Sequence, residues 1–248
     1  MTNIKLMIEY DGAAYGGWQS QINAPTVQDA VRAALRAVTG EDTTVFGAGR
    51  TDSGVHALGQ VANFRTASTM APERFSVALN THLPADIRVK DSRAVPDGFH
   101  AQFSACGKRY RYTLCVSRQG TALRRGTSWH VPPGLDLAAM EEAAALILGT
   151  HDFSAFQSAG SRVRNTVRTV TRSELTREGE FLHYDVAADG FLYNMVRILT
   201  GTLVQCGRGK IAPPAVEALL HGGSRGGAGP TAPAHGLCLV EVFYPQGL

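Results

Sequence analysis

The chain has 248 residues, of which 44% are hydrophobic and 18% charged, with a net charge of +3. These proportions are typical of a globular protein with its own core, organised as one large domain or two small ones. No apolar run reaches the ~18 residues of a membrane span and no signal peptide precedes the first predicted strand, so we expect a cytoplasmic protein. The four cysteines form no CxxC pair and no zinc-like cluster, which indicates reduced structural thiols.

The first half of the chain predicts a βαββαβ order. Residues 4–10 alternate as a strand, and residues 26–39 carry apolar side chains at helical spacing. Thr26 is a natural N-cap, and Gly40 ends the helix. The remaining predicted elements are strands at 43–47 and 59–65, a short helix after Pro72 and a strand from Ile87 to Lys90. This is the split βαβ order of ferredoxin-like folds.

The second half repeats that order. Its predicted elements are a strand at 109–116, a helix from Asp136 to Leu148, strands near 166–175 and 180–187, a helix from Phe191 to Cys206, a short helix after Pro213 and a last strand from Leu237 to Tyr244. The Gly- and Ala-rich stretch 221–233 predicts a mobile loop. We therefore expect an α+β protein of two ferredoxin-like halves, residues 1–104 and 105–248, with adjoining antiparallel sheets and a basic central cleft.

Positive charge is concentrated in the second half. Residues 98–248 carry fifteen Lys and Arg against eleven Asp and Glu, whereas residues 1–97 carry nine against ten. Two windows without acidic residues contain Lys108, Arg109, Arg111, Arg118, Arg124 and Arg125, and Arg162, Arg164, Arg168 and Arg172. Such windows suit a polyanionic partner, whose phosphates they would neutralise. The alternative is a solvated face whose acidic residues come from elsewhere in the fold.

A glycine-rich loop with one aspartate lies between two predicted strands of the first half. Residues 47–59 read GAGRTDSGVHALG. The glycines permit positive φ and leave room for a large planar ligand, while Arg50 and Asp52 provide a fixed positive charge and a carboxylate. The loop therefore suits chemistry on a bulky anionic substrate, although a plain polar turn has the same composition.

Two tyrosines in the second half lie on one face of a strand. Tyr110 and Tyr112 are two residues apart, so Arg109 and Arg111 lie on the opposite face. An aromatic face beside a basic one suits a stacked nucleobase next to a phosphate track. The alternative is that one or both tyrosines belong to the core.

The predicted helix 191–206 is apolar around much of its circumference and carries one charged residue, Arg197. Its apolar stripe comprises Leu192, Met195, Val196, Leu199, Leu203 and Cys206. A partly buried arginine needs an anionic partner, since breaking such a pair costs about 3–5 kcal/mol. A structural carboxylate and an active-site aspartate satisfy that need equally well.

Other catalytic motifs are absent from the sequence. Ser53 and His56 lie near Asp52, but there is no G-x-S-x-G elbow and no second carboxylate placed to orient the histidine. There is also no HExxH helix, Walker A loop or GxGxxG motif. We therefore expect no metal and no cofactor.

Seven segments, in chain order, resemble the tRNA pseudouridine synthase A family. They are YDG at 10–12 with GWQ at 17–19, GAGRTDSGVHA at 47–57, FHAQFSA at 99–105, KRYRY at 108–112, HDFSAF at 151–156, FLYNMVR at 191–197 and TAPAHGL at 231–237. The resemblance covers almost the whole chain and implies the pseudouridine synthase fold.

The resemblance implies isomerisation of uridine to pseudouridine at positions 38, 39 and 40 of the tRNA anticodon stem-loop, by a homodimer without a cofactor. It implies that Asp52 is the catalytic aspartate, that Arg197 pairs with it and that Tyr110 stacks on the target base. Arg50 would help to displace that base, and Leu237 would contact it. Contacts with tRNA are implied for Phe99, His100, Ala101, Gln102, Phe103, Gly160, Ser161, Arg162, Val163 and Arg164.

Two residues depart from the family pattern. Ser53 stands where alanine is common, and we expect no consequence. Gln102 stands where arginine is common, which puts one phosphate contact in doubt. Two alternatives stay open: a tRNA-binding or tRNA-folding protein in which Asp52 is only a turn residue, and a synthase that acts on other RNA positions.

Overall fold

The computed structural model describes residues 1–160 and 163–246, which form two compact units. The first unit comprises Met1–Cys106 and Cys238–Leu248, and the second comprises Gly107–Leu237. The last strand therefore belongs to the first unit, whereas chain order placed it in the C-terminal half. The physical reason is a parallel pairing between segments far apart in sequence, which joins Cys238 to His56 and Leu239 to Ala57.

The first unit has the expected βαββαβ order. Its elements are β1 (Thr2–Tyr10), α1 (Val27–Thr39), β2 (Phe46–Gly47), β3 (His56–Thr66), the 3-10 turn η1 (Pro72–Arg74), α2 (Phe75–Asn80), β4 (Ile87–Val95) and β10 (Leu237–Phe243). β1 is antiparallel to both β3 and β4, β2 pairs with β3, and β10 runs parallel to β3 on its other side. The α+β class is confirmed, although β2 is shorter than predicted.

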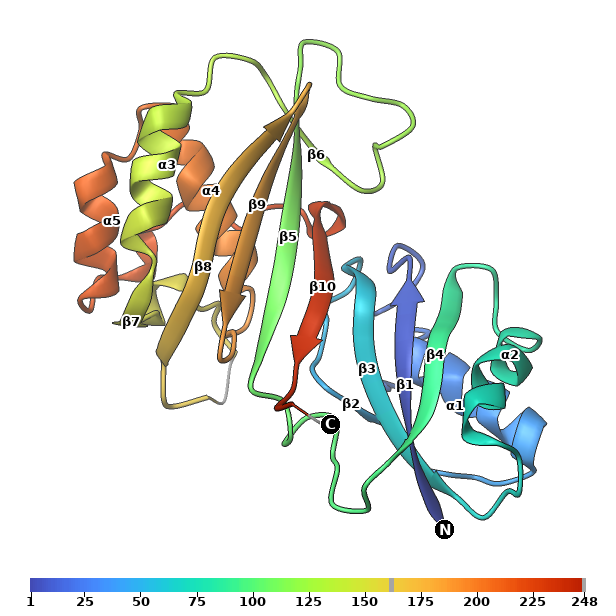
Figure 1. The fold of residues 1–248 in the computed structure, drawn as a ribbon. Coiled ribbons are helices and arrows are strands. Elements are labelled where there is room, and N and C mark those ends of the chain that lie inside the picture. The colour runs from blue at the N-terminus through green and yellow to red at the C-terminus, as the bar shows by residue number, and fades with distance from the viewer. Residues whose placement is uncertain (161–162, 247–248) are drawn as a thin grey trace. The chain divides into compact units, whose positions relative to one another are not determined.

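Both helices of the first unit pack on its sheet (Figure 1). Thr26 caps α1 by accepting the Asp29 N–H at 3.2 Å, and Gly40 ends the helix with a φ of 74°. The core includes Ile4, Leu6, Ile8, Val27, Val31, Leu35, Phe64 and Phe75. Phe64 on β3 and Phe75 on α2 meet edge to face, with ring centroids 5.4 Å apart. Burial of each such side chain contributes about 1.5–3 kcal/mol.

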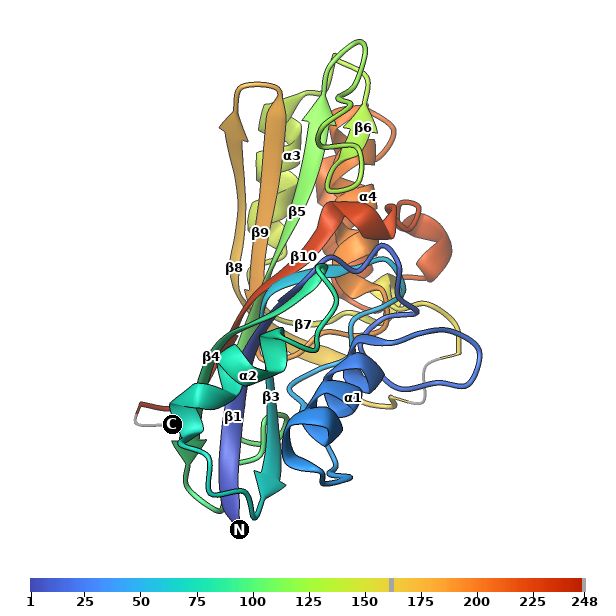
Figure 2. The ribbon, with the colours of Figure 1, turned by 90° about the vertical axis from the view of Figure 1, so that its right-hand side faces the viewer.

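The second unit is an antiparallel sheet covered by helices on one side (Figures 1 and 2). Its elements are β5 (Gly107–Val116), β6 (Trp129–Val131), α3 (Leu137–Leu146), β7 (Gly149–Asp152), η2 (Ser154–Phe156), β8 (Val167–Glu178), β9 (Phe181–Ala188), α4 (Met195–Gly207), α5 (Pro213–Leu220), η3 (Arg225–Gly227) and η4 (Ala234–Gly236). The strands follow the order β5-β9-β8-β7, and the short β6 runs parallel to β5. The sequence did not predict β6 or β7, which are too short to show an alternating pattern.

Helix α4 begins at Met195, four residues later than predicted. Its N-cap residue, Asn194, has a φ of 61° and a ψ of 8°, which places residue 194 in the left-handed region and interrupts helical geometry. Eleven of the thirteen helix residues are buried, including the whole predicted apolar stripe within the helix. The predicted helix therefore exists, but residues 191–194 form a turn that leads into it.

The Gly- and Ala-rich stretch 221–233 is partly packed against α4, contrary to the expected mobile loop. Gly201 lies so close to the loop that an added Cβ would overlap the carbonyl of Pro230. The backbone N–H of Gly229 donates to Thr202 Oγ1 at 2.9 Å. Gly201 and Gly229 face each other and allow this close approach of the two backbones. The glycine-rich composition alone predicted a flexible loop.

None of the helices in the described part of the chain combines the length and the hydrophobicity needed to span a lipid bilayer.

Candidate active site

The predicted site residues fall in both units, and each group has its own local framework. The first unit contains Arg50, Asp52 and the segment 99–103, while the second contains Tyr110 and Arg197. Leu237, the first residue of β10, is the last residue of the second unit and is buried.

Asp52 begins a tight turn in the loop between β2 and β3. Its carbonyl accepts the Val55 N–H at 3.1 Å, and Gly54, in the third position of the turn, has a φ of 77°. A turn with positive φ at this position favours glycine. Ser53 Oγ and the Gly54 N–H both donate to the Tyr15 carbonyl, at 3.2 and 3.3 Å. The turn leaves Asp52 half-buried and Arg50 exposed.

The backbone before Asp52 is held by the segment 10–18, which connects β1 to the region before α1. Gly17 has a φ of 101°, and an added Cβ there would overlap the carbonyl oxygen of Thr51. The same carbonyl accepts the Trp18 N–H at 3.2 Å. An added Cβ at Gly47 would overlap the Trp18 indole. Close packing, rather than a need for flexibility, therefore requires glycine at both Gly17 and Gly47.

A buried hydrogen bond anchors the same backbone to β1. Tyr10 Oη and Thr51 Oγ1 lie 2.8 Å apart, and both side chains are buried. Burial raises the pKa of the Tyr10 hydroxyl well above its ordinary value, so this group stays protonated. The hydroxyl pair therefore acts as a neutral structural link, one residue before the carboxylate.

The far side of the turn is held in a similar way. An added Cβ at Gly12 would overlap the Val55 carbonyl. His56 Nδ1 lies 3.1 Å from the Gly12 backbone nitrogen and 3.0 Å from Asp11 Oδ1. The segments YDG and GWQ, to which the sequence assigned no role of their own, thus position the aspartate loop. The glycines of these two segments were the sequence signal from which this positioning role could have been predicted.

The predicted tRNA-contact segment 99–103 is anchored by two buried asparagines. Asn3 Nδ2 donates to the Phe99 carbonyl at 2.9 Å and Asn63 Oδ1 accepts the Ala101 N–H at 2.8 Å. Phe99 is 4% exposed and Ala101 is fully buried, so neither side chain is accessible. The accessible members are His100, Gln102 and Phe103.

Three rings form an exposed aromatic edge beside that segment. His100 stacks on Phe103 with centroids 4.4 Å apart and an interplanar angle of 29°. Its other neighbour is Phe46 of β2, with centroids 4.8 Å apart. Phe46 and Phe103 are 40% and 79% exposed, which is unusual for phenylalanine and indicates a surface suited to stacking. The sequence did not single out Phe46, because its partner residues lie more than 50 positions away.

In the second unit, Tyr110 and Tyr112 share one face of β5, as predicted, and both are buried. Tyr112 is a core residue whose hydroxyl donates to the Pro233 carbonyl at 2.7 Å. Tyr110 packs edge to face with Phe191, at 5.1 Å between centroids. On the opposite face, Arg111 forms bidentate hydrogen bonds with Asp185 of β9. An acid from outside the acid-free window thus pairs with one of its arginines.

Arg197 is half-buried near the start of α4. Its Nε donates to the Ala232 carbonyl at 2.7 Å, and its Nη1 donates to Asn194 Oδ1 at 2.7 Å. The Ala232 N–H in turn donates to the Arg197 carbonyl at 3.1 Å. These two acceptors, a backbone carbonyl and a side-chain amide oxygen, are neutral. They fix the plane of the guanidinium without neutralising its charge.

The segment that follows Ala232, the acceptor of the Arg197 bond, packs against β5, the strand that carries the two tyrosines. Pro233 accepts the Tyr112 hydroxyl bond, and Gly236 lies against the Tyr112 ring so closely that an added Cβ would overlap it. Leu237 follows directly and is 6% exposed. The family-like segment 231–237 therefore packs against both α4 and β5.

The segment 160–164 is only partly described. Gly160 is exposed with a φ of 87°, and Val163 and Arg164 are exposed. Ser161 and Arg162 lie outside the described residues.

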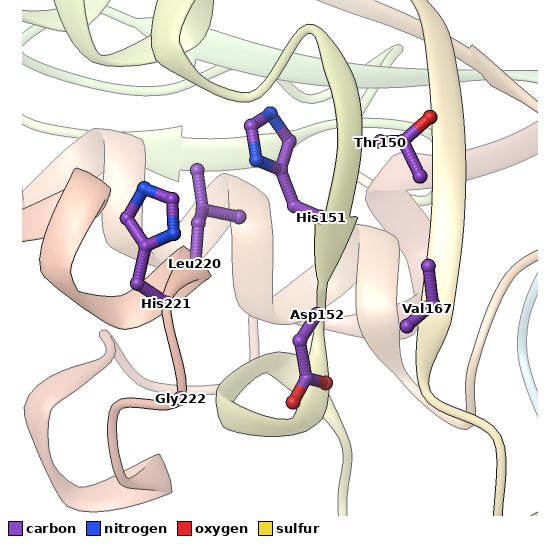
Figure 3. Close-up of a pocket in the computed structure, with 7 residues that line it drawn as sticks. All are labelled: Thr150, His151, Asp152, Val167, Leu220, His221 and Gly222. Carbon is purple, nitrogen blue, oxygen red and sulfur yellow. The ribbon is translucent and has the colours of Figure 1, made fainter.

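The second unit also contains a pocket of about 410 Å³, formed by β7, the start of β8 and the end of α5 (Figure 3). It is lined by Thr150, His151, Asp152, Val167, Leu220, His221 and Gly222, and by none of the predicted catalytic residues. The Asp152 carboxylate points away from the two imidazoles and accepts bonds from Thr166 and Ser154, of which the Thr166 bond contributes most to lowering its pKa. His151 Nε2 lies 2.8 Å from the Leu148 carbonyl. These polar groups therefore serve the local fold.

No set of three or more His, Cys, Asp or Glu side chains is arranged to hold a metal ion within the described residues.

Comparison with known proteins decides the family. A family model described as tRNA pseudouridine synthase matches residues 6–104 and 143–245. The chain belongs to the tRNA pseudouridine synthase family. Arg50, Asp52, Arg197 and Leu237 lie within the matched segments of this synthase family, whereas Tyr110 lies between them.

Full-length relatives support the same assignment. A protein from Acetivibrio thermocellus is 52% identical over 244 residues, which cover 98% of this chain and 100% of that protein. Proteins from Moorella thermoacetica and Ruminiclostridium cellulolyticum are 49% and 48% identical, also over 98% of this chain and 100% of theirs. All three are named tRNA pseudouridine synthase A.

Proposed function

We propose that this protein isomerises uridine to pseudouridine at positions 38, 39 and 40 of the tRNA anticodon stem-loop. Family membership and the names of three full-length relatives support an isomerase that acts on tRNA uridine. The assignment of Asp52 as the catalytic residue rests on the structure around its side chain. A half-buried carboxylate stands in a turn whose backbone is packed against glycines on both sides. A plain surface turn needs no such framework.

The first step is extrusion of the target uridine from the stacked anticodon arm. Unstacking a base costs a few kcal/mol. Arg50, which is exposed beside the turn, occupies the vacated space and holds the backbone phosphate. Tyr110 offers a ring on which the extruded uracil stacks, which returns about 1–3 kcal/mol.

The chemical step exchanges one bond to the ribose for another. Asp52 assists cleavage of the N1–C1′ bond, the uracil rotates in the site, and C5 bonds to C1′. The proton on C5 then leaves for water, and N1 takes up a proton. Substrate and product have the same atoms and the same oxidation state, so the reaction requires no redox cofactor.

Arg197 would act by pairing with Asp52. A charge-assisted hydrogen bond holds a carboxylate ionised and fixes its direction. The guanidinium suits this role because Ala232 and Asn194, which both accept hydrogen bonds from it, are neutral. Its positive charge is therefore not consumed by these two bonds.

Binding of tRNA would use the exposed residues of the predicted contact segments. His100 and Phe103 provide stacking surface, and Gln102 provides a polar contact. We also propose that the protein is cytoplasmic and that it is a homodimer. Light scattering on the purified chain tests the dimer directly. A monomer at all concentrations would contradict this part of the proposal.

The decisive experiment uses tRNA transcript that carries tritium at C5 of uridine. Wild-type protein should release tritium to water, whereas Asp52→Ala should release none while binding tRNA with similar affinity. Ser53→Ala, in the same turn, is the matched control and should release tritium like wild type. Binding without release by wild type would favour the alternative of a tRNA-binding or folding protein.

Mapping the modified positions completes the assignment. Transcripts in which single uridines at 38, 39 and 40 are replaced should lose release in proportion to the sites removed. Release that persists when all three are replaced would indicate a synthase for other RNA positions. Release by Asp52→Ala would overturn the assignment of that residue.

A further inference from the structure

The geometry points to Asn194 as a positioning residue that fixes the guanidinium of Arg197. This inference rests on the proposed catalytic role of Arg197. It concerns a residue for which the sequence predicted only a place inside a helix.

The backbone at Asn194 is unusual. Within residues 1–160 and 163–246, Asn194 is the one non-glycine residue with a positive φ. Left-handed backbone disfavours side chains with a Cβ, and glycine adopts it without strain. Asparagine tolerates it better than most residues, and such positions cluster at functional sites. A non-glycine side chain at this position is therefore expected to have a structural or functional role.

The side chain has no capping role. Asn194 occupies the N-cap of α4, where asparagine usually accepts a bond from a helix N–H, but its side chain makes no such bond. Instead, Oδ1 accepts from Arg197 Nη1 at 2.7 Å and Nδ2 donates to Ser158 Oγ at 3.0 Å. Both ends of the amide are thus directed away from the helix backbone.

The orientation of the amide follows from its partners. A guanidinium only donates hydrogen bonds, so the amide oxygen must face Arg197. The amide nitrogen then faces Ser158, whose hydroxyl oxygen can accept. Ser158 also donates its backbone N–H to the Tyr193 carbonyl at 3.1 Å, so the turn before α4 is held through both main chain and side chain.

Asn194 fixes the guanidinium at a different atom from Ala232. Ala232 holds Nε, and a planar group held at one atom can pivot about it. The bond from Nη1 to Asn194 opposes that rotation. Because the amide is neutral, it sets direction without neutralising the charge. An aspartate at 194 would offer the same acceptor geometry but would compete for the positive charge.

The test combines three variants with wild type. Asn194→Gly removes the side chain and keeps the left-handed backbone free of strain. Asn194→Asp keeps size and acceptor but adds a negative charge. Arg197→Lys keeps the charge and removes Nη1. Each is measured for thermal unfolding, for the Kd of tRNA and for the rate of tritium release in a single turnover at saturating enzyme.

We expect Asn194→Gly to unfold near the wild-type temperature and to bind tRNA with unchanged Kd, but to release tritium about tenfold or more slowly. In the Arg197→Lys background the same change should add less than about twofold, because the bond it removes is already lost. Asn194→Asp should fold normally and also be slow. A purely structural role would instead lower the unfolding temperature of Asn194→Gly and leave the single-turnover rate intact.

Two outcomes overturn the inference without touching the proposed function: a wild-type rate in Asn194→Gly, or fully multiplicative effects of Asn194→Gly and Arg197→Lys. Failure of the proposed function is distinguished by the absence of tritium release from wild type. Should Asn194→Gly fail to fold, Asn194→Asp decides, since a wild-type rate in that variant contradicts the need for a neutral acceptor.

Discussion

The backbone of Gly17 lies directly against that of Thr51, the residue that precedes Asp52. An added Cβ at Gly17 would overlap the Thr51 carbonyl oxygen, and this same oxygen accepts the Trp18 N–H at 3.2 Å. The φ of Gly17 is 101°. The position of the aspartate loop is therefore set by a contact that only glycine permits.

Gly17→Ala should disturb both the fold and the reaction. The substitution combines a strained φ with overlap of backbone atoms, and we expect a loss of about 1–3 kcal/mol in the free energy of unfolding. Tritium release should fall further than this loss explains, because the loop that carries Asp52 must move. Urea unfolding and single-turnover rates measure the two effects.

Gly40→Ala is the matched control for Gly17→Ala. Gly40 also has a positive φ, 74°, but no atom lies within 4 Å of the position of an added Cβ. It should lose stability through φ alone and keep the wild-type rate. Equal rates in the two variants would contradict the role of the Gly17 contact.

The sequence predicted those parts of the fold that local signals specify. Thr26 and Gly40 marked the ends of α1, and the spacing of apolar residues marked most strands. The place of β10 in the first unit could not be predicted from local signals, because its pairing with β3 joins residues about 180 positions apart. Strand pairing over such distances depends on the whole fold.

The same limit applies to the site. The glycines and Asp52 of residues 47–59 were visible as a motif, and Arg197 was visible as the one charged residue of an apolar helix. The resemblance supplied its pairing with Asp52. The neutral acceptors of Arg197 were not visible, because Ala232 acts through its backbone carbonyl. Asn194 lay in a helical pattern, and only its backbone conformation distinguishes it.

The two tyrosines of β5 should respond differently to loss of the hydroxyl. Tyr112→Phe leaves the Pro233 carbonyl without its 2.7 Å bond, so the free energy of unfolding should fall by about 1–3 kcal/mol. Its rate should stay within about threefold of wild type. Tyr110→Phe keeps the stacking ring but should slow tritium release by about 100-fold or more if its hydroxyl assists removal of the C5 proton.

Thermal unfolding and single-turnover release on both variants check this contrast. Each tyrosine variant serves as the control for the other, since the same group is removed two residues apart on one strand. Unchanged turnover in Tyr110→Phe would leave Tyr110 as a stacking surface only.

Gln102 stands where arginine is common in the family. We therefore expect that Gln102→Arg increases the affinity for tRNA. Gln102 is exposed in the contact segment, so Gln102→Arg adds a positive charge without disturbing the core. One further phosphate contact should steepen the dependence of log K on log salt by about one. Filter binding between about 50 and 200 mM salt measures the slope. Gln102→Glu, of similar size, should weaken binding, and equal effects of both charges would exclude a phosphate near this residue.

Stability below neutral pH should depend on His183 of β9. Its side chain is 11% exposed, and Nδ1 lies 3.1 Å from Thr113 Oγ1. Burial, with a smaller contribution from the Arg111 guanidinium, lowers the pKa of His183 below its ordinary value, against the opposite effects of Glu178 and Asp185. The folded protein therefore holds this imidazole neutral where the unfolded chain, with a pKa near 6.5, takes up a proton.

The sign of the pH dependence follows from that difference. Above about pH 6.5 the contribution of His183 to stability is fully present, and it is lost as the pH falls toward the lowered pKa of the folded state, because the unfolded chain then binds more protons. His183→Gln stays neutral and keeps a polar partner for Thr113. The free energy of unfolding of this variant should therefore fall less than that of wild type between about pH 7 and about pH 5. Urea unfolding across this range measures the difference, with His82→Gln, at an exposed position, as the control that should follow wild type. Parallel curves for wild type and His183→Gln would show that acid destabilisation originates at other groups.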